Sequence, residues 1–289
     1  FGKSPYQNVI VNGLVLAEDG KKMSKSLQNY PDPMELADRT GVDAMRLYLL
    51  SAPIMRGEDL NFSEKEVLEL QRKNIGRLHN VLAMYELYAD DTPAARTSPH
   101  ALDRWICARL DELIIESTAG YEHYELDRAT RPIIDFIDDL SVWYLRRSRD
   151  RLKGAAQADK TVALGTLRYV LETLARVIAP AMPFYAEYLF QRVRATDGPE
   201  SVHLAAWPVA DTPAADLLED MSKTRAIVTA ALEARTKAGI KVRQPIGAVY
   251  GPTLPATMVP LVLEELNAKT YEVAETVSID TELTPALLD

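Results

Sequence analysis

Cysteine is almost absent from this sequence, because Cys107 is the only one among 289 residues. That excludes a disulfide framework and any metal site built from several cysteines. Long apolar runs are also missing, since none approaches the roughly 18 residues of a membrane-spanning helix. The sequence also lacks the pattern of a signal peptide, in which a positively charged segment is followed by an apolar stretch. We therefore expect a protein of a reducing, cytoplasmic compartment, with no membrane partner.

The composition shows no sign of intrinsic disorder. Hydrophobic residues make up 47% of the chain and charged residues 26%, which is enough apolar content for a packed core. The net charge of −9 argues mildly against a polyanionic partner. That charge is uneven, because residues 211–289 carry seven basic and twelve acidic residues, whereas residues 141–153 carry five basic residues and one acidic residue. The middle of the chain is therefore locally basic.

The first sixty residues begin with a strand signal. Residues 8–17 alternate β-branched and aliphatic side chains around Asn12 and Gly13, which predicts a β-hairpin. Residues 21–26 follow a predicted turn at residues 18–20 and have no apolar periodicity, so a loop is expected there. Two short helices are expected next, over residues 33–37 and 43–50.

The remainder of the chain predicts a helix bundle followed by a smaller mixed part. Apolar residues recur at helical spacing between short polar or proline-containing breaks, which favours an antiparallel bundle. The expected bundle helices cover residues 63–89, 101–119, 127–152, 160–178 and 183–194. Beyond a proline-rich linker, helices are expected over residues 214–238 and 255–267, and strands over residues 240–249 and 271–279. The fold class is therefore mainly α, with an N-terminal hairpin and a small C-terminal α/β appendage, in three parts: residues 1–62, 63–200 and 201–289.

The loop over residues 22–26 carries the most chemistry. Lys22 and Lys25 supply two ammonium groups, Ser24 and Ser26 supply two hydroxyls, and Met23 lies between them. Such a loop can cover a polyphosphate and neutralise the charge on a leaving pyrophosphate. Composition alone favours the plainer alternative of a solvated basic loop.

The pentapeptide Lys-Met-Ser-Lys-Ser resembles the signature loop of class I aminoacyl-tRNA synthetases. Its flanks, together with the runs over residues 41–49, 138–151 and 238–245, are similar to those of isoleucyl-tRNA synthetases. The resemblance spans essentially the whole chain, in the family's order. One departure is Gln28, where many relatives carry glycine.

The resemblance implies a function. The family joins isoleucine to tRNA(Ile), using ATP with Mg²⁺, through attack of the amino-acid carboxylate on the α-phosphate. It implies that Lys25 stabilises the ATP phosphates with help from Lys22 and Ser24, and that Met23 and Ser26 complete the phosphate-binding loop. It also implies that residues 63–200 are an anticodon-binding domain, and that residues 1–62 end the catalytic domain. A monomer is expected, with no metal site in this chain.

Other parts of such an enzyme are missing. The sequence contains no His-Ile-Gly-His motif, which forms the other half of the family's ATP site, and no editing domain. We therefore expect a C-terminal piece of a longer enzyme that by itself neither activates isoleucine nor edits valine.

The helix predicted over residues 127–152 ends in arginines that divide between two faces. At about 100° per residue, Arg147 and Arg151 continue the apolar stripe, whereas Arg146, Arg149 and Lys153 gather on another face. The second group either contacts tRNA phosphates or is solvated at a helix end. The first group is expected to pair with buried carboxylates, such as those of Asp138 or Asp139.

The remaining candidates are weaker. Lys241 and Arg243 alternate with apolar residues on one predicted strand face, so they either meet tRNA or line a solvated edge. Three aromatic residues could stack on unpaired bases, but their spacing favours core packing: Trp105, Trp143 and Tyr144. The four histidines show no ligand spacing. Two alternatives stay open, namely a valyl or leucyl enzyme and a stand-alone tRNA-binding protein derived from a synthetase.

Overall fold

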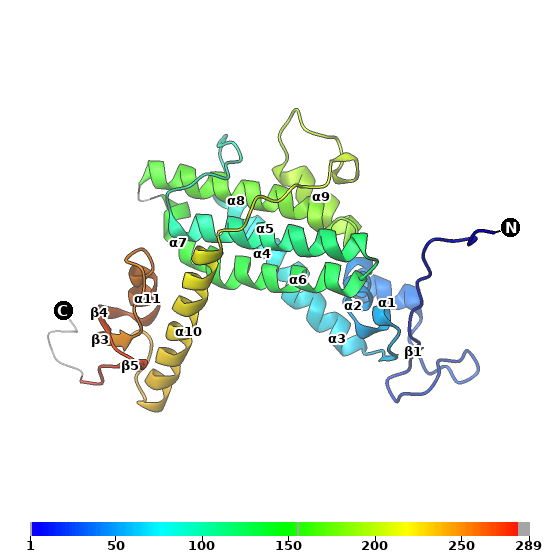
Figure 1. Ribbon diagram of the computed structural model, residues 1–289, viewed down its shortest axis with the longest axis horizontal. Coiled ribbons are helices and arrows are strands. Elements are labelled where there is room, and N and C mark those ends of the chain that lie inside the picture. Colours follow the sequence, from blue (N-terminus) through cyan, green and yellow to red (C-terminus); the bar gives the residue numbers. More distant parts are fainter. Residues whose placement is uncertain (1, 155, 283–289) are drawn as a thin grey trace. The chain divides into compact units, whose positions relative to one another are not determined.

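The computed structural model describes residues 2–154 and 156–282 (Figure 1). The chain forms two compact units, Phe1–Pro213 and Ala214–Asp289. The division expected after residues 62 and 200 stays a prediction. Within the described residues, no helix combines the length and the apolar character needed to cross a membrane.

The first unit begins with a small stem around a two-stranded sheet. Strand β1 (Val15–Leu16) pairs in parallel with β2 (Leu60–Asn61). The expected turn at residues 18–20 is present, because Leu16 and Lys22 form an antiparallel bridge across it. Helices α1 (Pro33–Thr40), α2 (Val42–Leu50) and the short η1 (Pro53–Arg56) complete the stem.

The hairpin expected around Asn12 and Gly13 is wrong. Residues 9–14 form no strand, and the amide N–H of Gly13 donates to the carbonyl of Ile54 at 2.9 Å. A Cβ at Gly13 would overlap the backbone carbonyl of Glu58. This glycine is therefore needed for a close approach between two backbone segments and not for a turn.

The helix bundle is confirmed. The first expected helix is one continuous run, in which the π-helical segment η2 (Gln71–Ile75) interrupts α-helix. Figure 1 shows α5 (Ala101–Glu122), α6 (Leu126–Asp138) and α8 (Gln157–Ile178) lying along one another. Their buried faces are mainly aliphatic and aromatic, and they also contain several buried polar side chains, among them those of Asp103, Asp111 and Asp127. The bundle elements are α3 (Glu64–Leu70), η2 (Gln71–Ile75), α4 (Gly76–Tyr88), α5 (Ala101–Glu122), α6 (Leu126–Asp138), η3 (Asp139–Leu145), α7 (Arg146–Lys153), α8 (Gln157–Ile178), α9 (Pro183–Val193) and η4 (Val202–Leu204).

The third expected helix also contains a π-helical segment, and this segment moves the buried face. Up to the end of this segment, the buried positions follow the predicted stripe, which includes Leu140 and Tyr144 within the segment itself. After it, the fully buried residues of α7 are Ser148 and Leu152, one position later than the stripe predicts. A π-turn accommodates one extra residue in a helix, so every following side chain is rotated. The expectation that arginines continue the stripe is therefore only partly correct.

Polar contacts attach the stem to the bundle. The carboxylate of Asp43 accepts from the backbone N–H groups of Phe184 (3.4 Å) and Tyr185 (2.6 Å), and so caps the first turn of α9. Nearby, the guanidinium of Arg46 donates to the carbonyls of Pro180 (2.8 Å) and Ala181 (3.1 Å). A carboxylate at a helix N-terminus is favourable. These contacts fix α2, and with it the stem, on the junction of α8 and α9.

The second unit is the expected small α/β structure. Its elements are α10 (Ala215–Lys237), β3 (Ile246–Gly251), α11 (Val259–Leu266), β4 (Ala268–Val273) and β5 (Ser278–Ile279). The sheet order is β4-β3-β5, with β4 parallel and β5 antiparallel to β3. The single strand predicted over residues 271–279 is wrong, because the chain reverses direction between β4 and β5. The alternating pattern continues across the reversal and therefore could not locate it.

Candidate functional site

The loop over residues 22–26 is irregular, as expected, and one side chain closes it. The side-chain oxygen of Asn29 accepts from the backbone N–H of Ser24 at 2.9 Å, and its NH₂ group donates to the carbonyl of Lys22 at 3.2 Å. The hydroxyls of Ser24 and Ser26 lie 2.7 Å apart. Asn29 is a site residue that no pattern in the sequence marks, although a polar amide directly after a loop is a common closing residue.

Met23 anchors the loop to the apolar core of the stem. Its side chain is half-buried and packs against the apolar cluster of the stem, which includes Leu36, Tyr48 and Phe62. The centre of the loop is thus held by an apolar contact, while Lys22 and Lys25 remain exposed. A flexible thioether suits such a contact.

The two lysines of the loop have no anion beside them. Lys22 and Lys25 are exposed and form no ion pair within residues 2–154 and 156–282. The preceding lysine behaves differently, because Lys21 pairs with Asp19 at 2.8 Å and this hydrogen bond raises the pKa of Lys21. Two uncompensated ammonium groups on an anchored loop form a surface suited to phosphate groups.

Gln28 ends the loop in a left-handed backbone conformation. Its φ is +47°, and its N–H donates to the carbonyl of Ser24 at 3.0 Å. A side chain there costs about 1–2 kcal/mol relative to a right-handed conformation. A glycine at this position would avoid that cost.

The three cationic side chains predicted to contact phosphates do share one exposed face of α7. Arg146, Arg149 and Lys153 are all exposed. Arg146 donates to the carbonyl of Val142 at 3.1 Å, and Lys153 pairs with Asp150 at 3.0 Å. Their role in binding stays a prediction.

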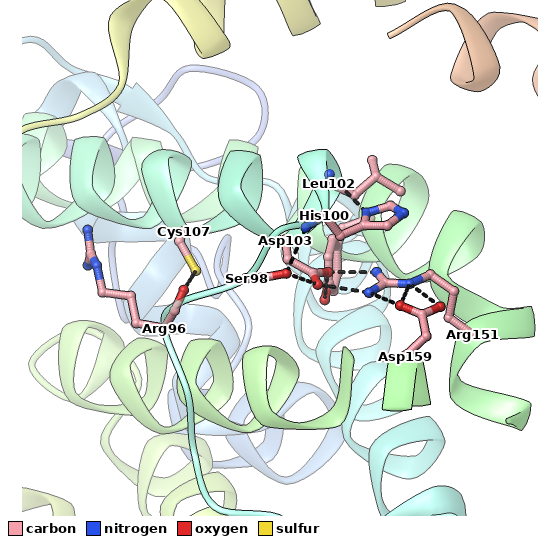
Figure 2. A network of polar contacts seen from close by, with 9 residues as sticks. Arg96, Ser98, His100, Leu102, Asp103, Cys107, Arg151 and Asp159 are labelled. Carbon is pink, nitrogen blue, oxygen red and sulfur yellow. Dashed lines mark hydrogen bonds and ion pairs between the residues drawn. The ribbon is translucent and has the colours of Figure 1, made fainter. Parts of the chain in front are cut away.

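Arg151 points inward and joins a buried network (Figure 2). Its guanidinium contacts both carboxylate oxygens of Asp103, at 2.8 and 2.9 Å, and also pairs with Asp159 at 2.8 Å. Asp103 is fully buried. The expected partners of Arg151 were wrong, since Asp138 pairs with Arg77 and Asp139 accepts from Arg109 at 2.8 Å. Arg147 lies over the ring of Trp143, 5.4 Å from its centroid.

Further donors complete the network around Asp103. The hydroxyl of Tyr144 donates to it at 2.9 Å and that of Ser98 at 2.7 Å. Burial raises the pKa of Tyr144 well above its usual value. The network thus ties α5, η3, α7 and α8 together, and it determines how α7 is rotated in the bundle.

The aromatic and thiol side chains belong to the core. Trp105, Trp143 and Tyr144 are buried, which confirms core packing over exposed stacking surfaces. Cys107 is also buried, and burial raises the pKa of its thiol to about 12. In the described part of the chain, no group of three or more His, Cys, Asp or Glu side chains could hold a metal ion.

Lys241 and Arg243 do not lie on a strand, so this expectation was wrong. Strand β3 begins only at Ile246, and residues 241–244 form a turn in which the N–H of Gln244 donates to the carbonyl of Lys241 at 3.0 Å. Pro245 has no N–H to extend the strand backwards. Both cationic side chains are nevertheless exposed.

Comparisons with known proteins place these features in one family. Residues 103–250 match the model of the anticodon-binding domain of tRNA ligase, and residues 1–63 match the model of class I tRNA synthetases (I, L, M and V). The isoleucine–tRNA ligase of Chlamydia trachomatis is 40% identical over 283 residues, covering 93% of this chain and 27% of the relative. That of Treponema pallidum is 37% identical over 298 residues, with the same coverage. The chain therefore spans about a quarter of the length of these relatives.

A solved structure supports the fold. The LeuRS–tRNA–LeuAMS ternary complex of Agrobacterium radiobacter matches with a TM-score of 0.52 and 23% identity, covering 72% of this chain and 24% of that one. The family models and the curated relatives agree with each other along the chain. The chain therefore belongs to the class I tRNA ligases that carry this anticodon-binding domain, and its curated relatives are isoleucine–tRNA ligases.

Proposed function

We propose that this chain is the part of an isoleucine–tRNA ligase that supplies the phosphate-binding loop of the ATP site and a surface for tRNA(Ile). The observation that carries the proposal is the anchored loop with two uncompensated lysines, Lys22 and Lys25. The isoleucine assignment rests on the relatives, which cover 93% of the chain. A monomeric, cytoplasmic enzyme is part of the proposal.

The isoleucine carboxylate attacks the α-phosphate of ATP, so that a bond forms between a carboxylate oxygen and the α-phosphorus while the bond from that phosphorus to the pyrophosphate breaks. Lys25 and Lys22 hold the departing pyrophosphate by donating to its oxygens, and the Ser24 hydroxyl adds a third donor. Because such donors act where charge develops, they stabilise the transition state more than the ground state. Mg²⁺ would arrive with the phosphates, since Mg²⁺ sites typically combine few protein carboxylates with substrate phosphates.

The loop is tested in the full-length enzyme by isoleucine-dependent pyrophosphate exchange. Lys25→Ala should lower kcat by roughly 10²–10³, as expected for removal of one transition-state donor. Lys21→Ala is the matched control, because Lys21 already pairs with Asp19 and should change kcat little. Equal effects of the two substitutions would refute the loop's role. Pyrophosphate exchange by the isolated chain would refute the proposal that it is inactive alone.

The tRNA surface is tested through salt dependence. Replacing Arg149 by Gln should weaken tRNA(Ile) binding and reduce the slope of log affinity against log salt by about 1, as for one lost phosphate contact. Arg128→Gln is the control, because Arg128 is an exposed arginine of α6 that pairs with Glu125 at 3.0 Å. Unchanged slopes in variants of Arg146, Arg149 and Lys153 would show that this face does not bind tRNA. Tighter binding of tRNA(Val) would contradict the isoleucine assignment.

A further inference from the structure

The second unit contains a buried cation with no anion beside it. Arg235, on the last turn of α10, is only 1% exposed. Its guanidinium donates to the backbone carbonyls of Lys241 (2.5 Å), Leu266 (3.0 Å) and Gln244. It forms no ion pair with any described residue, and burial lowers its pKa. Burying a charge among neutral dipoles is costly, so this arrangement calls for an explanation beyond packing.

The carbonyls that Arg235 attracts determine which side of the turn faces solvent. Residues 241–244 form a β-turn that is closed twice, by Gln244 N–H to the Lys241 carbonyl (3.0 Å) and by Lys241 N–H to the Gln244 side chain (2.9 Å). In a trans peptide the N–H points away from the C=O. The N–H of Val242 therefore points away from the guanidinium. Within the described chain, no hydrogen bond involves the N–H of Val242 or of Arg243.

Several further cationic residues lie on this turn or on the elements that hydrogen-bond to it. The side chains of Lys241 and Arg243 are exposed on it. Lys237 lies on the last turn of α10, and Lys269 follows Asn267, whose side-chain NH₂ group donates to the carbonyl of Arg243 at 3.0 Å. None of these four forms an ion pair with a described residue, although residues 211–289 are acidic overall.

We propose that the turn over residues 241–244 is a phosphate-binding site, in which the N–H groups of Val242 and Arg243 and the side chains of Lys241 and Arg243 bind one phosphate group. Arg235 is the positioning residue, because it holds two carbonyls of the turn inward and places its own charge behind them. Successive free N–H groups in a turn are a known kind of anion site. If the proposed tRNA function holds, the phosphate belongs to the tRNA backbone.

The site itself is tested on the full 289-residue chain with inorganic phosphate. The amide resonances of Val242 and Arg243 should shift on addition of phosphate, compared with chloride at equal ionic strength. Arg243→Gln should abolish the shift at Val242, whereas Lys223→Gln, an exposed lysine of α10 that pairs with Glu219, should not. No shift in the unmodified chain would overturn the proposal.

The source of the phosphate is tested with tRNA(Ile). Arg243→Gln should weaken binding about 5- to 10-fold and reduce the salt slope by about 1, while Lys223→Gln leaves both unchanged. If tRNA binds but the two variants behave alike, the tRNA source is wrong and only small phosphate compounds remain. If the chain binds no tRNA at all, the proposed function fails, but the phosphate titration still decides the site.

Arg235→Lys tests the positioning role. This variant keeps the charge but loses the planar fork that reaches several carbonyls at once. We expect a folded chain, by circular dichroism, in which phosphate no longer shifts Val242 and the tRNA salt slope falls as in Arg243→Gln. Phosphate shifts equal to those of the unmodified chain would refute the role of Arg235. Should the variant not fold, the substitutions of the exposed Arg243 and Lys223 still decide whether the site exists.

Discussion

Arg151 and Asp103 form a two-pronged ion pair inside the bundle, with their nitrogen and oxygen atoms 2.8 and 2.9 Å apart. The two residues are 48 positions apart and lie on α7 and α5. Because the carboxylate is fully buried and also accepts from two hydroxyls, its geometry is fixed on every side. The pair therefore sets the rotation of α7, and with it the direction in which the exposed cations of that helix point.

Asp103→Ala should destabilise the protein strongly. The substitution leaves Arg151 partly buried with only Asp159 beside it, and breaking a buried pair costs about 3–5 kcal/mol. Urea unfolding measures the difference. Asp159→Ala is the matched control, because the Asp159 side chain is 42% exposed and should cost less than about 1 kcal/mol. Similar losses in the two variants would mean that the buried pair is no stronger than a surface one.

Asp159 should make a pH-dependent contribution to stability. The hydrogen bond from Arg151 lowers the pKa of Asp159 below its ordinary value of 3.8. Its contribution is therefore fully present above pH 3.8 and is lost as the pH falls through the lower, folded-state pKa. The stability difference between the unmodified chain and Asp159→Asn should shrink in that acidic range. If the stability difference between the two proteins instead grew as the pH fell, the lowered pKa of Asp159 would be contradicted.

Gln28→Gly should stabilise the loop. Glycine removes a left-handed strain of about 1–2 kcal/mol, offset by its greater freedom in the unfolded chain, for a net gain of up to about 1 kcal/mol. Chemical unfolding measures the gain. Leu27→Gly is the control, since the backbone of Leu27 has no positive φ and glycine there should be neutral or destabilising. A loss of stability in Gln28→Gly would mean that its side chain contributes more than the strain costs.

Gly13→Ala should be destabilising, because its Cβ would overlap the carbonyl of Glu58. Overpacking of this kind typically costs 1–3 kcal/mol, roughly the effect expected here. Gly76→Ala is the contrasting variant, because its nearest neighbour would be 3.8 Å away and alanine favours a helix by about 1 kcal/mol. Thermal unfolding should place the two variants on opposite sides of the unmodified chain.

Much of the fold could be predicted from the sequence, for a reason visible in α5 and α8. Each has a broad apolar face with helical spacing, and burial of that face outweighs every local alternative. The predicted hairpin at Gly13 was wrong because a glycine in the sequence is compatible both with a turn and with a close approach between two backbone segments. The strand predicted at Lys241 was wrong because the structure forms a turn there, and the guanidinium that holds this turn belongs to Arg235 on another element.

The site shows the same division. The pentapeptide over residues 22–26 carries its chemistry in its own side chains, so it could be recognised directly. The partner of Arg151 could not, because Asp103 comes close only once α5 and α7 have packed together. The role of Asn29 is local to the loop, but nothing in a single sequence distinguishes an amide that closes a loop from an ordinary loop residue.

The π-helical segment η3 absorbs one residue of the helix that runs from α6 into α7. Deleting one residue within residues 139–145 would restore α-helical winding and leave Ser148 and Leu152 in their interior places. The same residues wound as α-helix without a deletion would instead turn everything after the segment by about 100° and bring Arg147 and Arg151 to those places. A single codon lost in this segment would thus preserve the inside and outside of α7, whereas a change of winding alone would exchange them.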